Sequence, residues 1–210
     1  KKGGKNMKKI LKIALIVILI IALVVGGYFI ALNVTKTQAL STVDKMFTAL
    51  KTGDEEQIKQ YINIEDIIEK NETEDDSKAD NQDMEKTMLK NLNYEVVSTD
   101  VKINECTMKL NVSNKNLKTV FGNYISKAFS VAFSQAFGAM TEEEMDAQLK
   151  QYFEEQYNSE DIETVTTEVT INMKKENGKW NIKCDEDAFV NAVLPGYKEV
   201  EESLNNMNQE

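Results

Sequence analysis

The hydrophobic pattern begins with an apolar run that contains no charged side chain. It covers residues 13–32 and is rich in Ile, Leu and Val. At about 1.5 Å per helical residue it reaches about 30 Å, the thickness of the hydrocarbon core of a bilayer. Because a helix satisfies its own backbone hydrogen bonds in lipid, the run predicts a transmembrane helix. A cleaved signal peptide is the alternative, but signal sequences usually carry an apolar run of about 7–15 residues.

Three helical patterns follow the apolar run. The first covers residues 38–52 and is closed by Gly53, the residue type that favours a left-handed C-cap. The second begins at Asp54, which has the spacing of a capping box with Gln57. The third is centred on residues 84–92. Their apolar positions are Leu40, Val43, Phe47, Leu50, Ile58, Tyr61, Ile62, Ile64, Ile67, Ile68, Met84, Met88, Leu89 and Leu92.

The stretch over residues 69–83 separates the second and third of these patterns. It is acidic and has no large apolar side chain, so it predicts a loop. It also lacks the central Gly that an EF-hand loop needs, and we therefore predict no calcium site there.

From residue 94 the period changes from 3.6 to two, which is typical of strands with one buried face. Residues 94–102 and 105–113 predict one hairpin, with a turn through Ile103 and Asn104. A second hairpin, over residues 162–175 and 180–184, has Asn-Gly in its turn, the strongest short hairpin signal. Pairing about that turn sets Met173 opposite Ile182 and Ile171 opposite Cys184, so apolar residues face each other.

Residues 117–158 interrupt the strands with two helical patterns. The first, residues 117–140, is apolar over more than half of its circumference and has only Lys118 and Lys127 as charged residues. Such a helix is central to the core, lines a pocket, or meets a partner or the bilayer surface. Thr141 and Glu144 have capping-box spacing and predict the start of the second helix, which runs to residue 158. The candidate pocket or docking face consists of Phe121, Tyr124, Phe129, Phe133 and Phe137.

Together these patterns predict an α+β fold, with helices packed on a curved antiparallel sheet of about four strands behind one N-terminal transmembrane helix. A short helix over residues 185–194 should end the domain at Pro195 and Gly196. The expected segments are a cytoplasmic basic tail (1–12), the transmembrane helix (13–32), a linker (33–37), an extracytoplasmic α+β domain (38–196) and an acidic C-terminal tail (197–210).

Charge is distributed unevenly about the apolar run. The first 32 residues hold six of the 25 basic residues and none of the 35 acidic ones, so the positive-inside rule predicts a cytoplasmic N-terminus and a single-pass protein of the cell membrane with its domain outside. The remainder has 19 lysines against 35 acids, a net charge of −16. That charge argues against nucleic acid as a partner and predicts that the domain stands off anionic lipid headgroups.

The composition also restricts the chemistry. The chain has no His, which removes imidazole acid–base catalysis and His metal sites. It has no Ser-x-x-Lys motif either. Isolated acids such as Asp100, Asp185 and Asp187 lie where strand ends and caps place acids in any protein. We therefore predict no enzyme, no catalytic residue, no cofactor and no metal site.

The two cysteines, Cys106 and Cys184, are both expected on the core face of the sheet. In a simple meander the 162–175 strand lies between them, which separates their α-carbons by about 10 Å or more. A disulfide needs about 7 Å or less, so the meander predicts free thiols. The alternative order, with the last strand directly against residues 104–113, would bring the thiols together.

Two sequence stretches carry a family resemblance. The helix ending in MFTALKTGD (46–54) and the hairpin with NGKWNI (177–182), behind a single anchor, resemble extracytoplasmic domains of unknown function in Gram-positive bacteria. Those domains are similar to the nuclear-transport-factor-two-like and cystatin-like superfamily. The resemblance covers about residues 38–194 and implies helices in the concave face of a curved sheet, a potential pocket and no catalytic motif. The helical pair over residues 117–158 departs from that pattern and is expected to fill or roof the pocket.

The sequence thus predicts a membrane-anchored, non-catalytic binding or interaction module of the bacterial cell envelope. The abundance of Asn, Lys, Ile and Glu with no Arg indicates an AT-rich coding bias, which is why we expect a bacterium. The expected partners are the lipid bilayer through residues 13–32 and either a membrane or envelope protein or a small apolar ligand. The alternative function is a structural or signal-relaying single-pass membrane protein that works with a membrane partner.

Overall fold

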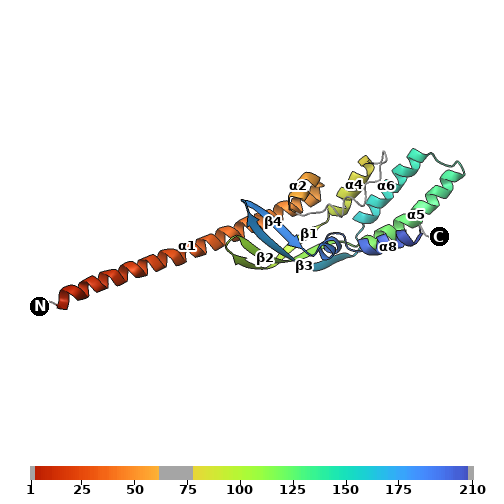
Figure 1. Ribbon diagram of the computed structural model, residues 1–210. Helices are drawn as coiled ribbons and strands as arrows, with labels where there is room; N and C mark the ends of the chain where they lie inside the picture. Colours follow the sequence, from red (N-terminus) through yellow and green to blue (C-terminus); the bar gives the residue numbers. More distant parts are fainter. Residues whose placement is uncertain (1–2, 62–77, 208–210) are drawn as a thin grey trace.

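The computed structural model describes residues 3–61 and 78–207, which form one long helix followed by a body of helices and strands (Figure 1). The α+β class predicted from the sequence is confirmed. The elements in chain order are α1 (Gly3–Thr52), α2 (Glu55–Tyr61), α4 (Lys78–Leu89), β1 (Asn93–Lys102), β2 (Glu105–Lys115), α5 (Leu117–Ala136), α6 (Glu142–Asn158), β3 (Thr164–Glu176), β4 (Lys179–Cys184), α7 (Glu186–Val193) and α8 (Tyr197–Met207).

Helix α1 runs without interruption for 50 residues from the apolar run into the body. The prediction of a linker over residues 33–37 is wrong, because no Gly or Pro lies between Gly27 and Gly53 to break the helix. The helix ends at Gly53, whose φ of 66° is the left-handed conformation expected for its C-cap. Within the described part, α1 is the one helix long and apolar enough to cross a membrane.

The sheet is an open antiparallel meander in the order β1-β2-β3-β4. Met173 pairs with Ile182 and Ile171 with Cys184, as the alternation predicts. Asn177 and Gly178 have φ of 52° and 81°, so both turn residues use the positive φ that a type I′ turn requires. Asn104 in the β1–β2 turn also has a positive φ, 61°.

The main core lies between one face of the sheet and the helices α1 and α7. The inward residues of β2 and β3 are buried there, and the ring of Phe47 stacks on that of Tyr94 with centroids 4.3 Å apart. Asp44 accepts a hydrogen bond from the Tyr94 hydroxyl at 3.2 Å, which adds a polar contact between α1 and β1. The largest fully buried side chains of this cluster are Phe47, Met46, Leu92, Met108, Leu110, Ile171, Val43 and Val112.

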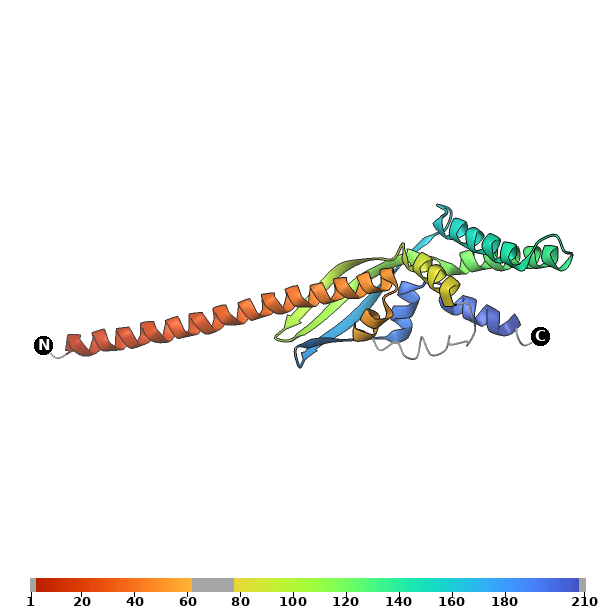
Figure 2. The same ribbon diagram turned by 90° about the horizontal axis from the view of Figure 1, so that it is seen from above.

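Helices α5 and α6 form an antiparallel hairpin that projects beyond the sheet, at the end opposite to the N-terminus of α1 (Figures 1 and 2). A second, smaller core joins its base to α4 and α8; its buried members are Leu117, Val120, Phe153, Tyr157 and Ile162. The hairpin therefore neither fills nor roofs the face of the sheet. The interpretation of residues 117–140 as a central core helix is wrong beyond the first turns, since only Leu117, Val120 and Val131 of α5 are buried.

Buried polar groups attach this hairpin to the sheet. Asn114, at the end of β2, is fully buried and donates from Nδ2 to the carbonyl oxygens of Met88 (2.9 Å) and Val193 (2.7 Å). The Tyr157 hydroxyl on α6 lies within hydrogen-bond distance of the Met88 carbonyl oxygen and of Asn114 Oδ1, at 2.8 Å from the latter. Because these bonds are buried, they fix the angle at which the hairpin leaves the sheet.

Other boundaries differ from the sequence prediction. Residues 78–83, predicted to be loop, belong to α4, and the predicted acidic tail begins as α8, in which Val200 is only 8% exposed. Helix α5 ends at Ala136 rather than at Met140, followed by Gly138 with φ of 70°. The predicted Thr141–Glu144 capping box is confirmed. The predicted apolar positions Ile62, Ile64, Ile67 and Ile68 lie outside the described residues.

Candidate interaction surfaces

The five aromatic residues proposed as a pocket or docking face divide into two groups. Phe121 and Tyr124 lie at the base of the hairpin, and each ring meets that of Phe153 edge-on at 5.8 Å. These contacts belong to the smaller core and serve packing. Phe129 and Phe133 lie further along α5, and Phe137 is its C-cap; their side chains are 68%, 67% and 74% exposed.

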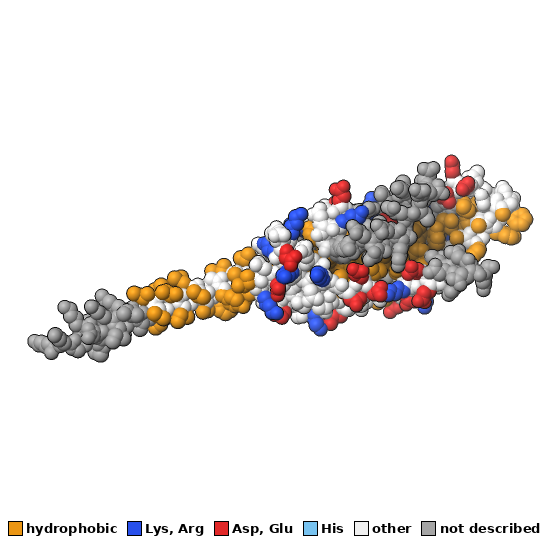
Figure 3. Space-filling model, in the orientation of Figure 1, with side chains coloured by type: hydrophobic (Ala, Val, Ile, Leu, Met, Phe, Trp, Pro, Cys, Tyr) orange, Lys and Arg blue, Asp and Glu red, His pale blue; other side chains and the backbone are white. Residues whose placement is uncertain are grey.

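The second group forms one continuous surface at the tip of the hairpin, which we call the phenylalanine tip (Phe129, Phe133 and Phe137). Residues four apart lie on the same side of a helix, and the rings of Phe133 and Phe137 are 4.6 Å apart. No charged residue occurs between Lys127 and Glu142. Figure 3 shows apolar side chains gathered at this end of the body. These three residues are therefore exposed aromatic side chains on a stretch without charge.

Acidic side chains border the phenylalanine tip. Helix α6 begins directly after the tip with Glu142, Glu143 and Glu144, and Glu144 accepts the backbone N–H of Thr141 at 2.8 Å. Carboxylates in the first turn also interact favourably with the positive end of the helix dipole. The tip is therefore an apolar surface with an anionic border on one side.

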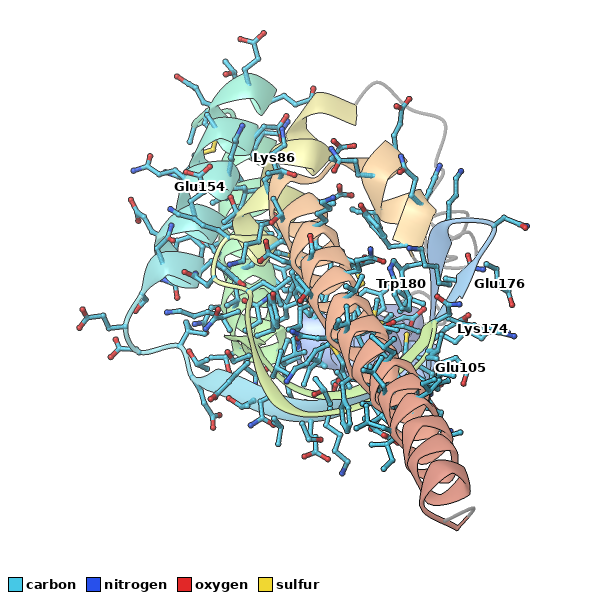
Figure 4. All side chains as sticks on the ribbon, turned by 90° about the vertical axis from the view of Figure 1, so that its left-hand side faces the viewer. Lys86, Glu105, Glu154, Lys174, Glu176 and Trp180 are labelled. Atoms are coloured by element: carbon cyan, nitrogen blue, oxygen red, sulfur yellow. The ribbon has the colours of Figure 1, made fainter. Side chains whose placement is uncertain are left out.

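A hollow of about 320 Å³ lies on the face of the sheet that α1 does not cover, close to the two hairpin turns. Lysines and carboxylates alternate around it: Lys102, Lys174, Lys183, Asp100, Glu105 and Glu176. Lys174 pairs with Glu176 at 3.2 Å, and Thr107 donates to Asn172 across the strands at 2.9 Å. Figure 4, seen from the free end of α1, shows Glu105, Lys174 and Glu176 together on one side of that helix. Sequence analysis did not identify these residues, because their clustering depends on strand pairing.

Burial changes the pKa of several side chains in the described part. Burial raises the pKa of the Cys106 and Cys184 thiols, and the nearby carboxylates of Asp100 and of Glu186 and Asp185 act in the same direction. Burial also raises the pKa of the Tyr157 hydroxyl, so that it remains a hydrogen-bond donor at neutral pH. A raised pKa makes the thiolate, the nucleophilic form of cysteine, harder to form.

The cysteines are free, and β3 lies between their strands, as the meander predicts. Cys106 lies opposite Met173, whereas Cys184 lies opposite Ile171. Among the described residues, no group of three or more Cys, Asp or Glu side chains is placed to hold a metal ion.

Comparison of the chain with protein-family models, with characterised proteins and with solved structures finds no match. The assignment of function therefore depends on the surfaces described above.

Proposed function

We propose that this chain is a single-pass membrane protein whose body lies outside the cytoplasm and acts as a non-catalytic interaction module of the bacterial cell envelope. The observation that carries the proposal is the phenylalanine tip, three exposed aromatic rings on an uncharged stretch at the end of the molecule farthest from the N-terminus of α1. Exposing such rings to water is unfavourable, at roughly 25 cal/mol per Å² of apolar surface, and a partner that covers them recovers this free energy.

The membrane anchor in this proposal is the N-terminal part of α1. Its apolar residues from Leu15 to Ile30 are exposed along the helix and contact no other part of the described body. The basic residues before this stretch support a cytoplasmic N-terminus.

The partner that fits the tip is a protein with an apolar groove bordered by basic side chains. The groove would cover the phenylalanines, and its basic border would complement the carboxylates of Glu142 and Glu143. A small enclosed ligand fits less well, because the tip residues are mainly exposed and line neither the hollow beside the turns nor the one between α7 and α8. A second copy of the chain also fits less well, because two acidic borders would then face each other.

The proposal retains the resemblance to the nuclear-transport-factor-two-like and cystatin-like superfamily. A long helix against one face of an antiparallel sheet is compatible with it. The absence of His and the raised pKa values of the thiols support a non-catalytic role.

The alternative, a signal-relaying membrane protein, is supported by one observation. The helix that emerges from the proposed membrane span also supplies Val43 and Phe47 to the main core, so a movement of the span would move the body with it. In that case the phenylalanine tip would be the surface through which the movement reaches a second protein.

The test is site-specific cross-linking in living cells. A photoreactive phenylalanine analogue at position 133 should form an adduct of defined mass with another protein, whereas the same analogue at the half-exposed position 97 on β1 should not. Replacing Phe129 and Phe137 by Ser should weaken the adduct at 133 while leaving the folded body intact, because both side chains are mainly exposed. No adduct at 133, or equal adducts at both positions, contradicts the proposal, and an adduct of twice the chain mass indicates self-association instead.

A further inference from the structure

We propose that the two hairpin turns of the sheet dock on the anionic lipid headgroups of the bilayer that α1 spans. The docking surface, called here the turn face, comprises the β1–β2 turn (102–105), the β3–β4 turn (174–179) and the adjacent Lys36 and Lys183. This inference rests on the membrane anchor proposed above and adds a second contact between the protein and the same membrane.

Both turns lie beside a short stretch of α1. The backbone N–H of Asn104 in the β1–β2 turn points to Thr35 Oγ1 at 3.5 Å, and Lys175 Nζ in the second hairpin donates to Gln38 Oε1 at 2.6 Å. The turns are therefore level with residues 35–38 of α1. Both turns point toward the N-terminal end of the molecule (Figure 2).

The turns lie only a short distance along α1 from the end of the apolar run. The apolar run ends at Leu32, which the body already covers in part. Thr35 and Gln38 lie three and six residues beyond it, or about 4.5 and 9 Å along the helix. A headgroup layer adds about 5–7 Å on each side of the hydrocarbon. Because α1 has no break in this region, the turns stay within reach of the headgroups, and the tilt of α1 determines whether they contact them.

The charge of the turn face is opposite in sign to that of the whole chain. The chain as a whole is acidic, with a net charge of −10, yet the turn face and its immediate neighbour Asp100 carry a net charge of +3. The six lysines are Lys36, Lys102, Lys174, Lys175, Lys179 and Lys183, and the three acids are Asp100, Glu105 and Glu176. In Figure 3 many of the lysine side chains lie at the end of the body where α1 emerges, whereas acidic side chains extend to the far end.

Several side chains of the turn face are free to contact a membrane surface. Lys36, Lys102 and Lys179 are exposed and form no ion pair within the part of the chain that the structure describes. Ile103, at the tip of the β1–β2 turn, is 50% exposed, so its apolar side chain faces water when no membrane is present. A turn with one exposed apolar residue between basic ones fits the interface of an anionic bilayer. The net charge alone predicted that the domain stands off such a surface; its distribution indicates the opposite at this end.

The test uses the full chain in lipid nanodiscs, which leave both membrane faces accessible. Trp180 is the only tryptophan and follows Lys179 in β4, so it reports on the turn face without an added label. Its fluorescence is measured with a small fraction of lipid that carries a nitroxide quencher on the headgroup. Discs of phosphatidylcholine alone are compared with discs that contain phosphatidylglycerol as well.

We expect stronger quenching in the anionic discs, and its loss at high salt, since raising the ionic strength from 0.1 to 1 M shortens the screening length from about 10 to 3 Å. Each Lys near an anionic surface changes the docking equilibrium by about fivefold, so the double variant Lys102→Glu, Lys179→Glu should reduce docking by at least about 25-fold. The matched control, Lys90→Glu with Lys118→Glu, alters exposed lysines at the other end of the sheet and should leave quenching unchanged.

Equal quenching in the two lipids, or equal effects of the two double variants, would overturn the docking. Incorporation into the discs is measured separately by co-elution. If the chain incorporates into the discs but Trp180 is not quenched by the headgroup label, the membrane anchor stands and docking of the turns is refuted. If the chain does not incorporate, both the anchor and the docking are refuted.

Discussion

The Tyr157 side chain links α6 to α4 and to the sheet through hydrogen bonds. Replacing it with Phe keeps the ring and removes the hydroxyl, which leaves the buried Oδ1 of Asn114 with one partner fewer. We expect a loss of about 1–2 kcal/mol in the free energy of unfolding. Chemical denaturation of the purified chain in detergent measures it.

The matched control is Tyr197→Phe. That hydroxyl forms no hydrogen bond within the described residues, so its removal should change stability by only a few tenths of a kcal/mol. Equal losses for the two variants would show that the buried bonds around Tyr157 contribute nothing specific.

A substitution at Gly178 tests the turn of the second hairpin. With φ of 81° this position is unfavourable for any residue with a Cβ, so Gly178→Val should destabilise the protein by roughly 1–3 kcal/mol. Gly122→Val is the control, because Gly122 is helical and nothing lies within 4 Å of an added Cβ. A melting temperature that is the same for Gly178→Val and the unmodified chain would contradict this account of the turn.

The third prediction at this scale concerns Cys106 and Cys184. Since β3 separates them, their thiols should remain reduced even after export to an oxidising compartment. Intact mass measurement of the unreduced protein should show no loss of two hydrogens. Such a loss in a folded monomer would mean that the strand order is different.

Residue identity predicted these local features well. Asn-Gly, the Thr141–Glu144 box and Gly53 are short-range signals, and the backbone conformation each one requires is set by neighbours within a few positions. The hollow beside the turns could not be predicted in this way, because Lys102 and Lys183 are 81 positions apart and meet only through strand pairing.

At the scale of elements, α8 shows how composition can conceal a helix. Its many acids indicated a solvated tail, yet Tyr197 packs against the smaller core and Val200, three residues further on, is buried. The prediction of a linker over residues 33–37 failed for a different reason. Polar residues such as Asn33 and Thr35 indicated a linker, although nothing in the stretch prevents a helix from continuing.

Helix α8 supplies an element-scale prediction. Ending the chain after Gly196 removes the Tyr197 ring, which packs against the smaller core, and the buried side chain of Val200, and should reduce the free energy of unfolding by roughly 2–4 kcal/mol. The substitution Glu201→Ala, on an exposed position of the same helix, should have little effect. Unchanged stability of the shortened chain would restore the original interpretation of a dispensable tail.

For α5, the sequence identified an apolar helix but not which of its sides is covered. Burial depends on where the hairpin leaves the sheet, and that angle is set by Asn114 and Tyr157, which lie outside the α5 pattern. The sequence therefore grouped the three residues of the phenylalanine tip with Phe121 and Tyr124, which the structure places against the smaller core.

At the scale of the whole molecule, the proposed topology predicts that external protease acts on the body in intact cells. Digestion should remove epitopes in α5 and α8 while leaving a fragment that contains the apolar part of α1. A cytoplasmic marker protein that survives the treatment serves as the control. Digestion only after lysis would reverse the topology.

If α1 spans the membrane as proposed, its continuity also sets the height above the bilayer at which the body could meet a partner. A flexible linker would let the phenylalanine tip search a large volume at low effective concentration, whereas a helix continuous with the core confines the tip to a narrow layer at one height above the bilayer. A partner whose groove lies in that layer meets the tip at high effective concentration, and a partner of equal affinity at another height does not meet it at all. Selection by distance from the membrane would thus precede selection by contact.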